Sequence, residues 1–304
     1  MDVTQPIEAP QLRPLGVGDI VDRVFALYRS KPLLYIALAA VPYLIFILVI
    51  AGATLALAGT FVGLAAFANL LASGDVPDPA QFAASVISFI GFVLFIVVAA
   101  VVILSTQTAA LVYAMSARYL GKQVTLGEAF RAGLSATPRV IGAGLLIFVL
   151  FVLLWAVLAV FMAVSQQVIV VVVAVIVGLV GTFYILASTL VTPIVATLEG
   201  VGPITAMRRA WSLAAGNRWR ILGLQLLLVV LNGVISAIVS AIFVTTIIGD
   251  ATLRTVAQQL VNAATTILWA PVEWGTFAIL YYDLRVRHEA FDLQLAAEAL
   301  PREP

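Results

Sequence analysis

The segment Thr197–Arg220, TLEGVGPITAMRRAWSLAAGNRWR, lies between two long apolar runs and determines how the rest of the chain is organised. Pro203 suits the first position of a helix, where its missing N–H costs nothing, and Gly216 suits the position just beyond a helix. Between them apolar residues recur every three or four positions, while arginines fall on the other faces. These apolar residues are Ile204, Met207, Trp211 and Ala214. The spacing predicts a short amphipathic helix that lies in a membrane interface.

Composition places the chain among membrane proteins. Of its 304 residues, 63% are hydrophobic and 10% are charged, against about 25% charged in an ordinary soluble domain. The net charge of +1 gives no reason to expect a nucleic-acid partner. The chain has no cysteine, and its single histidine, His288, lies in a charged tail. The sequence therefore predicts no metal site, no cofactor and no thiol chemistry.

Two earlier segments have the same character as the first. Over residues 17–28 the apolar positions follow the i, i+3, i+4, i+7 spacing of one helical face, which predicts an interfacial helix. In the basic segment 118–139, Thr125 and Glu128 match a capping box at a helix start. Pro138 is expected to end that helix. The chain thus contains three predicted interfacial helices.

Six apolar runs are long enough to cross a hydrocarbon core of about 30 Å, which takes roughly 20 helical residues. They are Leu33 to about Gly59, Gln81–Met115, Ile141–Val164, Val168 to about Leu198, Ile221–Ile248 and about Ala257 to Tyr282. Residues 60–71 contain Asn69 and run into the polar stretch SGDVPDP, which favours a membrane-surface helix over re-entry. The predicted fold is an all-α membrane domain, residues 15–293, with six transmembrane helices and three cytoplasmic interfacial amphipathic helices. A disordered tail, 1–14, precedes it and a C-terminal tail, 294–304, follows.

The basic residues support this topology. Fifteen of the 16 Lys and Arg residues fall in four segments. These segments lie before the first span, between the second and third spans, between the fourth and fifth spans, and after the sixth span. Only Arg254 falls in an opposite loop. Cytoplasmic loops are enriched in Lys and Arg, so the asymmetry predicts that both termini lie in the cytoplasm. The polar start of the chain predicts no cleavable signal peptide, so the first span is expected to remain as an anchor.

Four polar residues inside the predicted spans form the candidate intramembrane site. Glu273 lies about ten residues from the end of the sixth span, roughly 15 Å deep, where a charged acid costs about 2.5–3.5 kcal/mol. Two roles are open for it: handling of a proton or substrate, or a structural hydrogen bond between helices. Gln107, Gln225 and Asn232 are expected to bond across helices and hold the bundle together.

The basic segments are expected to attract anionic lipid, at about 1 kcal/mol per cation near the surface. The candidate head-group contacts are Arg23, Arg29, Lys31, Arg131, Arg139, Arg208, Arg209, Arg218 and Arg220. Anchoring the protein is the simpler role for these residues, and specific head-group binding is the alternative. The sequence contains no Gly-rich phosphate loop and no serine nucleophile elbow, so we predict no catalytic residue and no enzyme activity.

Three stretches resemble a known family. They are LRPLGVGDIVDRVFALYRSKP near the start, LVTPIVATLEGVGPITAMRRAWSLAAGNRW in the middle and ILYYDLRVRHEAFDL near the end. Over about residues 12–293 the chain resembles the bacterial membrane-domain family named after glycerophosphoryl diester phosphodiesterases, in its stand-alone form without a phosphodiesterase barrel. The resemblance implies a location in the bacterial cytoplasmic membrane. It transfers no catalytic residue, because the catalytic His and Arg of such enzymes have no counterpart here.

Two functions are compatible with these features. The first is a non-enzymatic scaffold or accessory module that binds anionic lipid or a partner protein at the cytoplasmic face. The second is a transporter or lipid-translocating protein that uses Glu273 in an intramembrane cavity, alone or in a homo-oligomer. A membrane-embedded hydrolase ranks last. A polar cavity at Glu273 would favour transport, whereas a tightly packed bundle would favour the scaffold.

Overall fold

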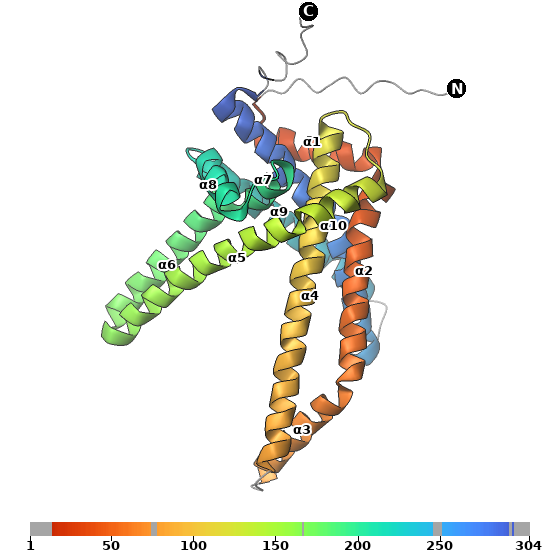
Figure 1. Cartoon of the computed structure of the whole chain (residues 1–304), viewed down its shortest axis with the longest axis vertical. Helices are drawn as coiled ribbons and strands as arrows, with labels where there is room; N and C mark the ends of the chain where they lie inside the picture. The colour runs from red at the N-terminus through yellow and green to blue at the C-terminus, as the bar shows by residue number, and fades with distance from the viewer. Residues whose placement is uncertain (1–13, 74–77, 166, 246–250, 292–293, 295–304) are drawn as a thin grey trace, which may run out of the picture.

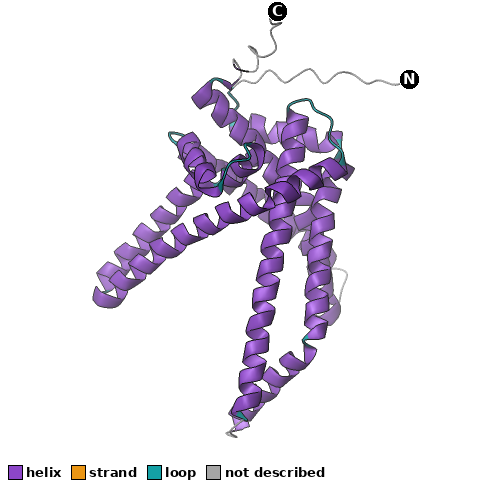
Figure 2. Ribbon diagram, in the orientation of Figure 1, coloured by secondary structure: helices purple, strands orange, loops and turns teal. Residues whose placement is uncertain are grey.

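The all-α prediction is confirmed over the residues that the structure describes. The computed structural model describes residues 14–73, 78–165, 167–245, 251–291 and 294, and the regular elements in these ranges are all helices (Figure 2). The predicted tails, 1–14 and 294–304, lie outside the described residues except for Pro14 and Gln294. The start of α1 and the end of α10 lie at the same end of the molecule (Figure 1).

Three helical hairpins make up most of the molecule. The first comprises α2 (Pro32–Ala56), α3 (Ala58–Ser73) and α4 (Pro79–Tyr119), and the second comprises α5 (Leu126–Ser165) and α6 (Val168–Thr189). The third comprises α9 (Arg218–Ser240), the π-helical η1 (Ala241–Thr245) and α10 (Ala251–Glu289). Figure 1 shows the first and second hairpins splayed apart, with α4 and α5 crossing close to their shared end.

A compact layer, here called the collar, joins the hairpins at one end. It consists of residues 14–31, which include α1 (Val17–Ser30); α7 (Thr192–Leu198) with Glu199 after it; α8 (Pro203–Ala214); the first turn of α9; and residues 281–289 of α10. Its apolar side chains are buried against one another, among them Ile20, Ile194 and Leu213. The hydrophobic core therefore lies in the collar and in the adjoining ends of the hairpins.

The far parts of the hairpins expose apolar side chains. Phe148 of α5 is 63% exposed, Val180 of α6 is 64% exposed and Leu226 of α9 is 64% exposed. Apolar surface of this extent is unfavourable in water and suits the hydrocarbon core of a bilayer. In the described part of the chain, five helical segments are long and apolar enough to cross a membrane: Pro32–Ala56, Pro79–Tyr119, Leu126–Ser165, Val168–Leu198 and Arg218–Phe243. The fold is therefore that of an all-helical membrane protein.

The sixth predicted span lies in α10, which is not among these five segments. Polar residues in the first half of α10, including Gln258 and Asn262, and Glu273 further along lower its mean hydropathy. The third hairpin nevertheless closes near its tip, where Nε2 of Gln258 donates to Oγ of Ser240 at 3.0 Å. The count of six spans stays a prediction.

The second predicted interfacial helix is not a separate element. The capping box is confirmed, since Thr125 N–H donates to Oε2 of Glu128 at 2.8 Å. The prediction that Pro138 ends this helix is wrong, because α5 continues through it to Ser165. The turn before Pro138 is fixed by packing: Thr137 Oγ1 donates to the Gly133 carbonyl at 2.9 Å and lies 2.8 Å from Thr106 Oγ1 of α4. Tertiary contacts here outweigh the local helix-breaking tendency of proline.

The fourth predicted span is divided rather than continuous. α6 ends at Thr189 and α7 begins at Thr192, with Pro193 in its first turn. Pro193 has no N–H to bond the Thr189 carbonyl four residues earlier, and its ring clashes with that carbonyl, which accounts for the end of α6 at Thr189. Residues 60–71 are helical within α3, as predicted, and Phe61 packs edge-on against Phe92 of α4.

Of the two remaining predicted interfacial helices, α1 buries part of its apolar face within the protein, whereas α8 buries mainly small residues. Ile20 and Val24 of α1 are fully buried, as its spacing indicates. α8 has the predicted bounds, and Gly216 beyond it has a φ of +74°. Its buried face, however, consists of Ala206, Ala210, Leu213 and Ala214, whereas Ile204 is 56% exposed. Small alanines allow α8 to approach its neighbours closely, which hydrophobicity alone does not indicate.

Candidate functional site: the charged collar

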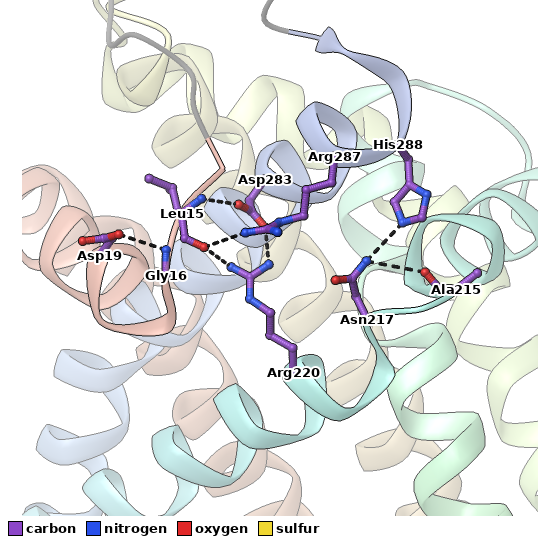
Figure 3. Close-up of polar contacts among 9 residues, drawn as sticks. All are labelled: Leu15, Gly16, Asp19, Ala215, Asn217, Arg220, Asp283, Arg287 and His288. Carbon is purple, nitrogen blue, oxygen red and sulfur yellow. Dashed lines mark hydrogen bonds and ion pairs between the residues drawn. The ribbon is translucent and has the colours of Figure 1, made fainter.

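The backbone of Leu15, through both its N–H and its carbonyl, is held at the centre of the collar by three charged side chains (Figure 3). Its N–H donates to Oδ1 of Asp283 at 2.6 Å, and its carbonyl accepts from Arg220 and, at 2.9 Å, from Nη2 of Arg287. The Asp283 carboxylate also accepts from Arg220 and from Nε of Arg287. The Asp283 side chain is fully buried, so both arginines neutralise a carboxylate that has no access to water.

Local sequence positions each part of this clamp. Gly16 precedes α1 in an extended conformation, and its N–H bonds to Oδ2 of Asp19 at 2.9 Å, so the Leu15 backbone lies outside the helix and its N–H and carbonyl bond other elements. Arg220 lies in the first turn of α9, just after the reversal at Gly216. Asp283 and its partner Arg287 are four residues apart and share one face of α10.

A second ionic network joins α7, α8 and α10. Arg209 pairs with Glu199 at the end of α7 and, at 2.9 Å, with Oε1 of Glu289. Glu289 also accepts from Nε of Arg285 at 2.9 Å, and the Tyr281 hydroxyl donates to Glu199 at 2.7 Å. Burial raises the pKa of Glu289, but its hydrogen bonds with the two arginines outweigh burial and hold that pKa below its ordinary value.

The nine predicted head-group contacts fall into different environments. Arg209 and Arg220 are ion-paired as described, and Arg23 donates from Nη1 to the Tyr119 hydroxyl at 3.0 Å. Arg139 donates to the Ser135 carbonyl one turn earlier in its own helix, and Arg218 contacts Ser188. The remaining four are exposed and form no ion pair within the described residues: Arg29, Lys31, Arg131 and Arg208.

The four predicted intramembrane polar residues do not form one site in the interactions seen here. Gln107 is buried and donates from Nε2 to the Ala39 carbonyl of α2 at 3.0 Å, which confirms a bond between helices. Asn232 accepts from Ser236 in its own helix, at 3.5 Å, and from no other described residue. Oε1 of Gln225 is buried and has no hydrogen-bond partner within the described part of the chain. Glu273 is half-buried and forms no ion pair with a described residue.

Sequence reasoning missed the acidic half of the collar. Asp283, Glu199 and Glu289 each bind arginine, yet none was a candidate. Their signal was available in part, because Asp283–Arg287 and Arg285–Glu289 have the i, i+4 spacing of helical ion pairs. The involvement of Leu15 had no sequence signal, since it acts through its backbone.

Two apolar grooves line the hairpins. One, of about 340 Å³, lies between α5 and α6 and is lined by residues such as Phe161 and Val173. The other, of about 610 Å³, lies between α2 and α4 around Gly52 and Phe95. Neither groove includes Glu273. Among the described residues, no group of three or more His, Cys, Asp or Glu side chains is placed to hold a metal ion.

Fold and collar together define a class: an all-helical membrane protein whose apolar hairpins extend from one charged layer. Comparison with protein-family models, with characterised proteins and with solved structures gives no match. The collar does bring together the three stretches that carry the family resemblance, since Leu15 of the first bonds Asp283 of the third, and Arg209 of the second pairs with Glu289 of the third. The family assignment stays a prediction.

Proposed function

We propose that this chain is a non-enzymatic module of the bacterial cytoplasmic membrane, with six spans and both termini in the cytoplasm, whose collar binds anionic lipid. The proposal rests on how the collar distributes charge. Three of its acids, Glu199, Asp283 and Glu289, pair with arginines, and Asp19 and Asp22 of α1 are exposed. Exposed cations remain on the outside at Arg29, Lys31 and Arg208. The outer surface thus carries more exposed cations than exposed carboxylates.

The position of the collar fits attraction to lipid head groups. The described ends of the chain and the helices of the collar lie at the same end of the three apolar hairpins (Figure 1). Cations placed there would lie at the level of the head groups and gain about 1 kcal/mol each from an anionic leaflet. A partner protein with an acidic surface, or a further copy of the chain, is the alternative occupant of this face.

Lipid preference can be measured by the quenching of tryptophan fluorescence by brominated phospholipids. In nanodiscs, wild-type protein should be quenched more by brominated phosphatidylglycerol than by brominated phosphatidylcholine at equal fraction. Replacing Arg29, Lys31, Arg131 and Arg208 with Gln should reduce that preference several-fold, because each cation contributes up to about fivefold. Asp22→Asn, which removes an exposed acid from α1, should leave or raise the preference. An unchanged preference in the fourfold variant would contradict the proposal.

Orientation and the transport alternative share a second experiment. The native chain has no cysteine, so single cysteines at Asn69, Trp211 and Glu273 report accessibility to a membrane-impermeant maleimide. Position 69 should react only from outside intact cells and position 211 only in inverted vesicles. Labelling at 273 would indicate a water-filled path and support transport, which neither groove supports at present. An unreactive 273 would support a packed structural module.

A further inference from the structure

Arg218 differs from the ion-paired arginines of the collar. Arg209, Arg220, Arg285 and Arg287 each bind a carboxylate. Arg218 binds none of the described carboxylates. It donates from Nε to Oγ of Ser188 at 2.8 Å, and its two Nη groups make no hydrogen bond within the described residues. It therefore retains a positive charge and two adjacent donors without an anionic partner.

Aromatic rings hold the Arg218 guanidinium in place. Its central carbon lies 4.6 Å from the centre of the Tyr184 ring and 5.9 Å from that of Trp211. The two rings pack edge to face, 5.6 Å apart. Stacking of this kind attracts the cation and restricts the rotation of its plane. A guanidinium fixed in this way presents its remaining donors in one direction.

The buried hydroxyl of Ser188 also holds the Arg218 guanidinium, by accepting a hydrogen bond from its Nε. Ser188 is fully buried and its Oγ donates to the Tyr184 carbonyl at 2.8 Å, so its lone pairs are oriented toward Arg218. Tyr184 and Ser188 belong to α6, Trp211 to α8 and Arg218 to the first turn of α9. Three elements thus converge to position one guanidinium, and the occupied Nε leaves its Nη edge for a ligand.

The surroundings of this edge are amphipathic. Tyr184 is 46% exposed and Trp219 is 87% exposed, and aromatic residues of this kind concentrate at membrane interfaces. Away from the collar, α6 and α9 expose apolar side chains, including Phe183 and Leu226. An anion at Arg218 would therefore have acyl-compatible surface directly adjacent to it.

We infer that Arg218, supported by Tyr184, Trp211 and Ser188, binds the phosphodiester head group of one anionic glycerophospholipid, with its acyl chains along α6 and α9. A guanidinium edge and two phosphate oxygens form the bidentate arrangement that arginine favours. This site rests on the proposed function, because it requires the collar to face a lipid leaflet. It differs from the general attraction of the exposed cations in that it is saturable and holds one molecule.

Native mass spectrometry of the full chain, released from nanodiscs containing phosphatidylglycerol and phosphatidylcholine, tests the site. Wild type should retain one phosphatidylglycerol molecule, and Arg218→Gln should weaken that binding about tenfold or more. Arg218→Lys keeps the charge but loses the stack and the fork, so most of the loss should persist. Ser188→Ala should give a smaller loss, because it only frees the guanidinium to rotate. Arg131→Gln removes an exposed cation elsewhere and should leave the retained lipid unchanged.

Two outcomes would overturn the site. If Arg218→Lys and Arg131→Gln reduced the retained phosphatidylglycerol equally, no specific site at Arg218 would exist. Displacement of the retained lipid by inorganic phosphate at equal concentration would show a site for a soluble anion, without a contribution from acyl chains. The proposed function is tested separately, by the preference for anionic lipid in the quenching experiment. That preference should fall in the variant that lacks four exposed cations and should remain in Arg218→Lys.

Discussion

Asp283→Asn should release the first helix from the collar. The amide that replaces the carboxylate can still accept from Leu15, but it directs an NH2 group toward the donors of Arg220 and Arg287 and removes their counter-charge. Breaking a buried ion pair costs about 3–5 kcal/mol. The Arg287 side chain is 33% exposed and is partly compensated by water. We therefore expect the lower limit, about 3 kcal/mol.

Reversible unfolding in mixed detergent micelles, with SDS as denaturant, gives this free energy directly. Asp19→Asn is the matched control, because Asp19 is an exposed acid whose one hydrogen bond among the described residues is from the Gly16 N–H, three positions earlier. Removing such a group costs about 0.3–1 kcal/mol. If Asp283→Asn destabilised the protein no more than Asp19→Asn, the clamp would contribute nothing and the reasoning would be refuted.

Two further measurements separate the clamp from a general loss of stability. A double-mutant cycle of Asp283→Asn with Arg220→Gln should give a coupling energy above about 0.5 kcal/mol, because the two side chains bond each other. A cysteine at Ile20, which is fully buried in α1, should react with maleimide about tenfold faster for each 1.4 kcal/mol by which Asp283→Asn favours opening. Additive effects and an unchanged labelling rate would place α1 outside the influence of Asp283.

Three other perturbations test different parts of the fold. Gly133→Ala should lower the free energy of unfolding by about 1–3 kcal/mol, because the added Cβ would lie 2.9 Å from atoms of α4. Gly144→Ala in the same helix is the control: its Cβ would have no atom within 4 Å, so the substitution should be neutral or stabilising. Unfolding in SDS measures both changes. Gln107→Leu should cost about 0.6–2 kcal/mol and Asn232→Leu almost nothing, since only Gln107 bonds another helix. The lowered pKa of Glu289 means that its contribution is present above the unfolded-state pKa and is lost as pH falls through the folded one. Unfolding followed from pH 6 to about pH 3 should therefore show an acid-induced loss of stability that is smaller in Glu289→Gln.

Sequence patterns that span a few residues correctly predicted helix faces, helix ends and a capping box. The apolar spacing of residues 17–28 placed Ile20 and Val24 on one face of a helix, and both are buried in α1. Pro203 and Gly216 bounded α8 as predicted. The capping box at Thr125 is present as its spacing indicates. Each of these features depends on residues a few positions apart, for which helix geometry fixes the outcome.

Contacts between distant residues could not be predicted in this way. Asp283 binds the backbone of Leu15, which lies 268 positions earlier, and a backbone group carries no sequence signature. Pro138 was expected to end a helix, but the contact of Thr137 with Thr106 of α4 keeps that helix continuous. Arg218 was one of nine similar cations until its neighbours from α6 and α8 distinguished it.

The length of α4 shows how the two halves of the molecule divide their roles. Its 41 residues correspond to about 60 Å of helix, about twice the thickness of a hydrocarbon core. Burial along it begins at Thr106, and the corresponding change along α10 occurs at Trp269. The exposed parts suit lipid and the buried parts form the packed base of the collar. Glu273 lies four residues beyond Trp269, on the packed side, where a half-buried carboxyl is more easily explained by helix packing than by a path through mid-membrane.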